Sequence, residues 1–302
     1  MTKEILLLLL VLGLMTNASG YAEEDREGAA ERRGAVAEDQ QSERGRRRNR
    51  QGQVGVKDPA EFRAEGGEVF SGPQRGEKLI GFKAVELAGD NQGKTIDPIA
   101  VADGRPQVIF LQDGNGVAIR GLFGIVDAIG KIDEKTDQDL HVSCVFLADD
   151  PNEIRSRFGR VFPGLMERGI DVIAVSADGR DGPGALGLDR TVSQTIILAN
   201  QGEVTRNFVA PQGLLYVDPH VMGGVAELVS EDRETVAGWL AAARETQERM
   251  RMRRGNERQA ESSNRFRQKL GELVRAGKIS REEAAELMQL AFPAENSRRD
   301  RR

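Results

Sequence analysis

The chain has 302 residues, and its 43 basic and 48 acidic side chains leave a formal net charge of −5. Because proteins that bind nucleic acid need a basic surface, this near-balance argues against nucleic acid as a partner. Cys144 is the single cysteine, so no internal disulfide can form, and stability must come from the hydrophobic core of one or two domains.

Residues 1–22 are predicted to form a cleaved secretory signal peptide. Lys3 adds positive charge to the amino terminus, residues 5–15 form an apolar run, and Ala18 and Gly20 provide small residues for cleavage. The run is too short to cross a bilayer. We therefore expect an exported protein, periplasmic or extracellular, without stable membrane insertion after cleavage. A retained hydrophobic N-terminal helix is the alternative.

Residues 23–75 are rich in Glu, Arg, Gly and Gln and poor in large apolar side chains. Such a composition buries too little surface to offset chain entropy, so a disordered charged leader is predicted. Within it, the basic run of residues 44–50 follows an acidic stretch and is interpreted as part of a solvated polyampholyte.

Residues 76–245 have the pattern of a folded domain. Strands are predicted at residues 79–87, 95–96, 107–112, 142–148 and 170–176, followed by a hairpin over 195–208 that turns at 200–202. Helices are predicted at residues 117–132, from Asp150 toward Met166, after Asp218, and over 231–254. This order predicts an α/β fold with a mixed central sheet flanked by helices.

A smaller C-terminal part follows the domain. Residues 246–263 are predicted to be a charged helical linker, residues 264–292 a helical hairpin, and residues 293–302 a basic tail. In the hairpin, Ser280 and Glu283 have the spacing of a capping box. We expect the hairpin to dock or to oligomerise, so that a homo-oligomer could form through it.

Four segments carry a resemblance to a known family. They are residues 82–87 (FKAVEL) with Gly93 and Lys94 after them, 108–112 (VIFLQ), 170–176 (IDVIAVS) and 195–204 (TIILANQGEV). In this order and spacing, over about residues 76–239, they resemble the thioredoxin-like superfamily in its redoxin and thiol-peroxidase branch, the AhpC/TSA type. The resemblance implies a thioredoxin-like three-layer sandwich.

The resemblance also locates an active site that this chain lacks. In active relatives, the turn after the strand at 107–112 holds the attacking cysteine, whose thiol pKa is lowered by the helix start. The matching positions here are close to Asn115 and Ala118, and the cis-proline position of the family falls on Ser193 or Gln194. The chain thus resembles a degenerate member without the active-site cysteines.

We expect a non-catalytic module that binds a protein or peptide in an exposed groove, with no cofactor and no metal. The groove residues are predicted to be Asp113, Gly114, Asn115, Gly116, Val192, Ser193, Gln194 and Thr195. The alternative is a one-cysteine peroxidase that uses Cys144, although its strand pattern favours a buried thiol. A third hypothesis is that the C-terminal hairpin performs the function and that the folded domain only carries the hairpin.

Other chemistry has weaker support in the sequence. His141 and His220 are the only histidines, which is too few for a His-rich metal cluster. Asp178 and Asp181 lie in a Gly-rich loop and are interpreted as turn residues. Asp113 is predicted to cap the helix that follows it.

Overall fold

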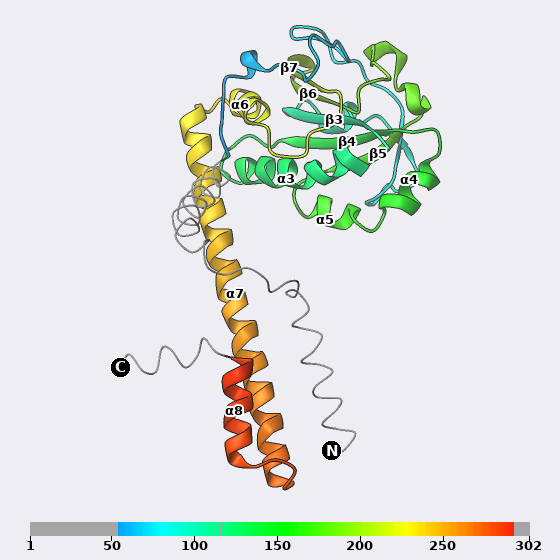
Figure 1. Cartoon of the computed structure of the whole chain (residues 1–302). Helices are drawn as coiled ribbons and strands as arrows, with labels where there is room; N and C mark the ends of the chain where they lie inside the picture. Colours follow the sequence, from blue (N-terminus) through cyan, green and yellow to red (C-terminus); the bar gives the residue numbers. More distant parts are fainter. Residues whose placement is uncertain (1–53, 115, 293–302) are drawn as a thin grey trace, which may run out of the picture. The chain divides into compact units, whose positions relative to one another are not determined.

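A computed structural model describes residues 54–114 and 116–292. The predicted signal peptide, the basic run at 44–50, Asn115 and the tail at 293–302 lie outside these residues. The described domain is built on one seven-stranded sheet (Figure 1). Its strands are β1 (Ala84–Glu86), β2 (Thr95–Ile96), β3 (Gln107–Asp113), β4 (His141–Leu147), β5 (Val172–Ser176), β6 (Gln194–Asn200) and β7 (Glu203–Ala210).

The strand order is β2-β1-β5-β4-β3-β6-β7. β3, β4 and β5 are parallel to one another, whereas β1, β2, β6 and β7 join the sheet as antiparallel neighbours. An N-terminal hairpin, three parallel strands linked by helices, and a closing antiparallel hairpin make up a thioredoxin-like fold. The α/β fold class predicted from the sequence is confirmed.

The helices are α3 (Gly116–Asp133), α4 (Pro151–Phe158), α5 (Phe162–Met166), α6 (Pro219–Leu228), α7 (Arg233–Arg275) and α8 (Arg281–Ala291). Asp150 and Asp218 accept backbone N–H bonds and cap α4 and α6, as predicted. The helix predicted to run from Asp150 to Met166 is instead two helices, since the chain leaves the helical path after Phe158.

The two faces of the sheet bury different partners. Alternate side chains such as Val108 and Phe110 on β3 pack against the helical face, together with apolar residues of α3 to α7. Their neighbours Ile109 and Leu111 point to the opposite face. That face is covered by loops and by residues around the short 3-10 helices η2 (Ala100–Ala102) and η4 (Gly184–Leu186). The sheet is therefore buried on both sides.

Residues 54–75 are ordered, so the predicted disordered leader extends too far into the domain. Val54 is buried, and the Lys57 N–H donates to the Pro219 carbonyl at 2.9 Å. The ring of Phe62 packs edge-on against Phe208 with centroids 5.2 Å apart. Two apolar anchors and backbone hydrogen bonds hold a segment whose average composition is that of a disordered chain.

A buried histidine, His141, is the first residue of β4, the middle strand of the sheet. His141 is 1% exposed, and its ring nitrogens lie 3.0 Å from Arg105 Nη2 and 3.1 Å from Ser143 Oγ. Asp171 Oδ2 lies 3.5 Å from Nδ1, and the Asp139 carboxylate binds Arg105. Burial is the main cause that lowers the pKa of His141; the negative charge of Asp171 opposes this shift, and the positive charge of Arg105 adds to it.

We expect the free energy of unfolding to fall as the pH drops below about 6.5. The folded state keeps His141 neutral, while the unfolded chain takes up the proton near that pH. The loss should grow as the pH is lowered further, because more of the unfolded chain then carries the protonated imidazole. Urea unfolding of the wild type and of His141→Gln between pH 5 and 7.5 checks this, and an unchanged pH slope in the variant would contradict it.

α7 leaves the domain and continues as one helix. Val236 and Leu240 are buried in the core, whereas residues 246–262 are exposed along their whole length. Exposed ion pairs, Glu245 with Arg249 and Arg253 with Glu257, support this polar stretch. The predicted linker is therefore the middle of α7 and not a separate element. Within residues 54–114 and 116–292, no helix is long and apolar enough to cross a membrane.

The C-terminal hairpin follows the end of α7. The chain turns after Arg275, and α8 runs back alongside the last turns of α7 (Figure 1). Ser280 and Glu283 form the predicted capping box at the start of α8. The rings of Phe266 and Phe292 pack edge-on near the open end of the hairpin, with centroids 5.8 Å apart.

Candidate functional site

The position that the sequence resemblance marks as a site lies between the end of β3 and the start of α3. Asp113 is the last residue of β3, and its N–H donates to the carbonyl of Ser193 at 2.9 Å. α3 begins only at Gly116, so the position before the helix is Asn115, outside the described residues. The capping of this helix by Asp113 stays a prediction.

Three of the predicted groove residues, Val192, Gln194 and Thr195, are buried. Gln194 and Thr195 are buried in β6, and Val192 is 5% exposed. Gln194 Nε2 donates to Gln112 Oε1 at 3.2 Å, while Gln194 Oε1 accepts the Leu214 N–H at 3.1 Å. Thr195 Oγ1 lies 2.8 Å from Ser71 Oγ. Gln194 and Thr195 thus do not line an exposed groove, which corrects the prediction.

A cleft of about 270 Å³, here called the polar cleft, opens on the β4 side of this position. From the predicted groove it includes Asp113, Gly114 and Val192. The other residues around it are mostly charged: Asp149, Asp150, Glu153, Asp181, Asp189, Arg157, Arg180 and Arg190. Several are already engaged with protein groups, since Arg157 binds the Gly114 carbonyl at 2.9 Å and Arg190 pairs with Asp181. The cleft is therefore lined by more carboxylates than guanidinium groups and has a negative formal charge.

A second cleft, of about 300 Å³, lies on the other side of the α3 start and is here called the apolar cleft. Its exposed apolar side chains are Val117 (42% exposed), Leu215 (59%) and Tyr216 (62%). Phe62 and Leu214 form part of its wall, and Arg63, Glu65, Asp218 and His220 are its charged or polar members. This site was not predicted from the sequence, because the apolar residues 214–217 lie outside any periodic element.

The loop at residues 211–217 is held tightly on α3. Gly213 has a φ of +77° and lies against Ala118, and the Gly213 N–H donates to the Ala210 carbonyl. A Cβ on Gly121 would lie 1.6 Å from the Leu214 carbonyl oxygen. Glycine at position 121 therefore permits the loop backbone to touch the helix. Leu215 and Tyr216 project from an anchored loop.

The lone thiol is remote from this surface. Cys144 is 0% exposed and lies in the centre of β4, in register with Phe110 on β3 and Ile173 on β5. Burial raises the pKa of the Cys144 thiol far above its usual range. The prediction that Cys144 is a buried core residue is confirmed. Ala118, one of the two positions at which the sequence resemblance places a cysteine, is itself buried in the first turns of α3.

No protein-family model and no curated protein sequence matches the chain. Solved structures with a similar fold include a secreted thiol-disulfide isomerase from Corynebacterium glutamicum, with 13% identity and a TM-score of 0.40 over 59% of this chain and 99% of that chain. Reduced Prx3 from Vibrio vulnificus has 17% identity and a TM-score of 0.39 over 52% and 98% of the two chains. Copper-bound ScoI from Arabidopsis thaliana has 10% identity and a TM-score of 0.36 over 51% and 99%. Likeness at this level concerns the fold alone.

Proposed function

We propose that the chain is an exported, non-catalytic thioredoxin-fold module whose apolar cleft binds a protein or an extended peptide. The observation that carries the proposal is the difference in exposure between the side chains of the apolar cleft and the thiol of Cys144. Val117, Leu215 and Tyr216 are exposed beside the start of α3, whereas the only thiol is enclosed in the sheet. Export rests on the pattern of residues 1–22.

The apolar cleft has the composition of a protein-binding surface. Tyrosine next to aliphatic side chains is typical of residues that dominate binding energy, and a polar rim orients the partner. In that rim, His220 Nδ1 lies 3.2 Å from Asp218 Oδ1. Because the loop is anchored by Gly121 and Gly213, little conformational entropy remains to be lost on binding.

The alternative function, a one-cysteine peroxidase, needs an exposed thiolate. Cys144 is 0% exposed, and burial raises the pKa of its thiol. Peroxide could reach this sulfur only if the sheet opened. The burial of Cys144 therefore favours the binding module.

Panning a phage-displayed peptide library on the full chain tests the proposal. Selected peptides should bind Leu215→Asp and Tyr216→Asp at least tenfold more weakly than the wild type, because a carboxylate would have to be desolvated against the apolar ligand. Ile80→Asp is the matched control, since Ile80 is also apolar and 50% exposed but lies outside the apolar cleft. Equal binding to all three variants would contradict the proposal.

A further inference from the structure

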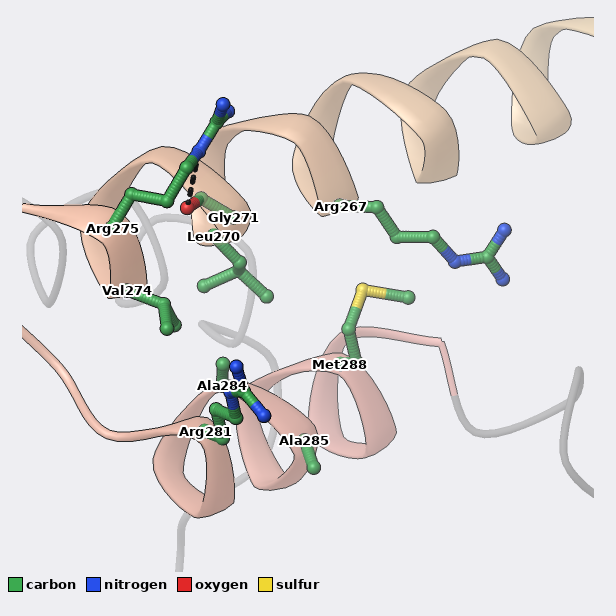
Figure 2. Close-up of a pocket in the computed structure, with 9 residues that line it drawn as sticks. All are labelled: Arg267, Leu270, Gly271, Val274, Arg275, Arg281, Ala284, Ala285 and Met288. Atoms are coloured by element: carbon green, nitrogen blue, oxygen red, sulfur yellow. Dashed lines mark hydrogen bonds between the residues drawn. The ribbon is translucent and has the colours of Figure 1, made fainter.

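The C-terminal hairpin carries a groove on one of its faces, here called the hairpin groove (Figure 2). It has a volume of about 600 Å³ and lies between the last turns of α7 and α8. Figure 2 shows Leu270 and Val274 pointing from α7 toward α8, and Met288 pointing back from α8. Three small residues, Gly271, Ala284 and Ala285, also line it.

The hairpin does not complete its own core. Leu270 is 4% exposed, but Val274 and Met288 are only half-buried, and Leu290 on α8 is 71% exposed. A helix as short as α8 gains its stability mainly from tertiary packing. Two helices with apolar residues at a spacing of three and four positions form a complete core when a further helix packs on them. The groove therefore has the geometry of a site for one more helix.

The charges at the rim indicate which helix fits. Arg267 and Arg275 on α7 and Arg281 on α8 all border the groove. Among the described residues that line it, none is a carboxylate. A second copy of this hairpin would bring arginine toward arginine across the same face, which like-charge repulsion disfavours. Glutamate or aspartate on the incoming helix would be attracted instead.

We propose that the hairpin groove docks an amphipathic helix of another protein, with an apolar stripe flanked by acidic residues. The apolar stripe would pack on Leu270, Val274 and Met288, and the acidic flanks would face Arg275 and Arg281. This is recognition of a helix in a groove, with hydrophobic anchors at helical spacing. The site is separate from the apolar cleft, so the chain would have two binding surfaces.

The test uses the full chain and two synthetic helical peptides about three heptads long. Both have Leu at heptad positions a and d. One has Glu at e and g, and its twin has Lys there. We expect the acidic peptide to bind at least tenfold more tightly than the basic one in fluorescence anisotropy, with affinity that falls as salt rises.

Charge reversal supplies the decisive variants. Arg275→Glu with Arg281→Glu should weaken the acidic peptide at least tenfold and improve binding of the basic one. Arg254→Glu with Arg258→Glu is the matched control, because it makes the same change in net charge at exposed positions of α7 outside the groove. Leu215→Asp should leave peptide affinity unchanged, which separates this site from the apolar cleft.

Four outcomes would overturn the proposal. They are equal binding of the two peptides, no binding of either peptide, and loss of affinity in the control pair as large as in the groove pair. The fourth is a concentration-dependent dimer, or binding to vesicles of anionic lipid, that Arg275→Glu with Arg281→Glu abolishes. In that case self-association or a membrane surface would account for the groove instead.

Discussion

Gly121→Ala is expected to destabilise the protein by about 3 kcal/mol, near the upper end of the usual range for overpacking. A Cβ at this position would lie 1.6 Å from the Leu214 carbonyl oxygen and 3.0 Å from the Leu215 Cα. Both contacts are to backbone, which cannot swing aside as a side chain can. Either α3 shifts against the sheet or the loop at residues 211–217 lifts away, and peptide binding in the apolar cleft should weaken as well.

Gly124→Ala is the control for this prediction. It lies in the same helix, three residues further on, and its Cβ would meet the Val217 Cγ2 at 3.4 Å, an ordinary contact. Alanine is favoured over glycine inside a helix by about 1 kcal/mol, so this variant should be neutral or more stable. Urea unfolding with equal m-values measures both changes. Equal stability of the two variants would show that the loop does not lie where the structure places it.

Gly116→Cys in a Cys144→Ala background is expected to create a reactive thiol. A Cβ on Gly116, the first residue of α3, meets no heavy atom of the described residues within 4 Å. The N–H groups of the first helical turn stabilise a thiolate there and should lower its pKa by one unit or more from about 8.5. Iodoacetamide labelling from pH 5 to 10 gives that pKa directly.

Gly255→Cys in the same background is the reference thiol. It lies in the exposed middle of α7, far from a helix start, and a Cβ there also meets no described heavy atom within 4 Å. Its pKa should stay close to about 8.5. If the two thiols titrate alike, the start of α3 has no special effect on the pKa of a thiol, which would contradict this prediction.

Much of the fold could be predicted because the signals were local. Residues 107–112 and 142–148 are continuous apolar runs of the length of a strand buried on both faces, and both strands were found close to their observed bounds. Asp150 and Asp218 stand directly before prolines, a pattern that marks a helix start. Ser280 and Glu283 likewise define the start of α8 by their own side chains.

The ordered segment before the domain could not be predicted from local signals. Its anchors are sparse, since the apolar side chains of Val54, Val56 and Phe62 stand among polar and charged residues, and their partners lie far along the chain. Ser71, for example, contacts Thr195 at a separation of 124 residues. Average composition therefore indicated disorder where a few long-range contacts fix the backbone.

The candidate site was found only in part. The sequence located the turn after β3 and the approach of Ser193, which receives a hydrogen bond from the Asp113 N–H. It could not show that Gln194 and Thr195 are both buried, because neighbouring strand residues face opposite sides of the sheet and both sides are covered here. Leu215 and Tyr216 were missed because an apolar pair in a loop has no periodic pattern to mark it.

The proposal of a non-catalytic module is tested by the labelling rate of Cys144 in the native wild-type protein at neutral pH. We expect no reaction with iodoacetamide or peroxide over the time in which the denatured chain reacts fully, since the sulfur lies between Phe110 and Ile173 inside the sheet. Rapid native labelling, together with peroxide consumption that Cys144→Ala abolishes, would contradict it.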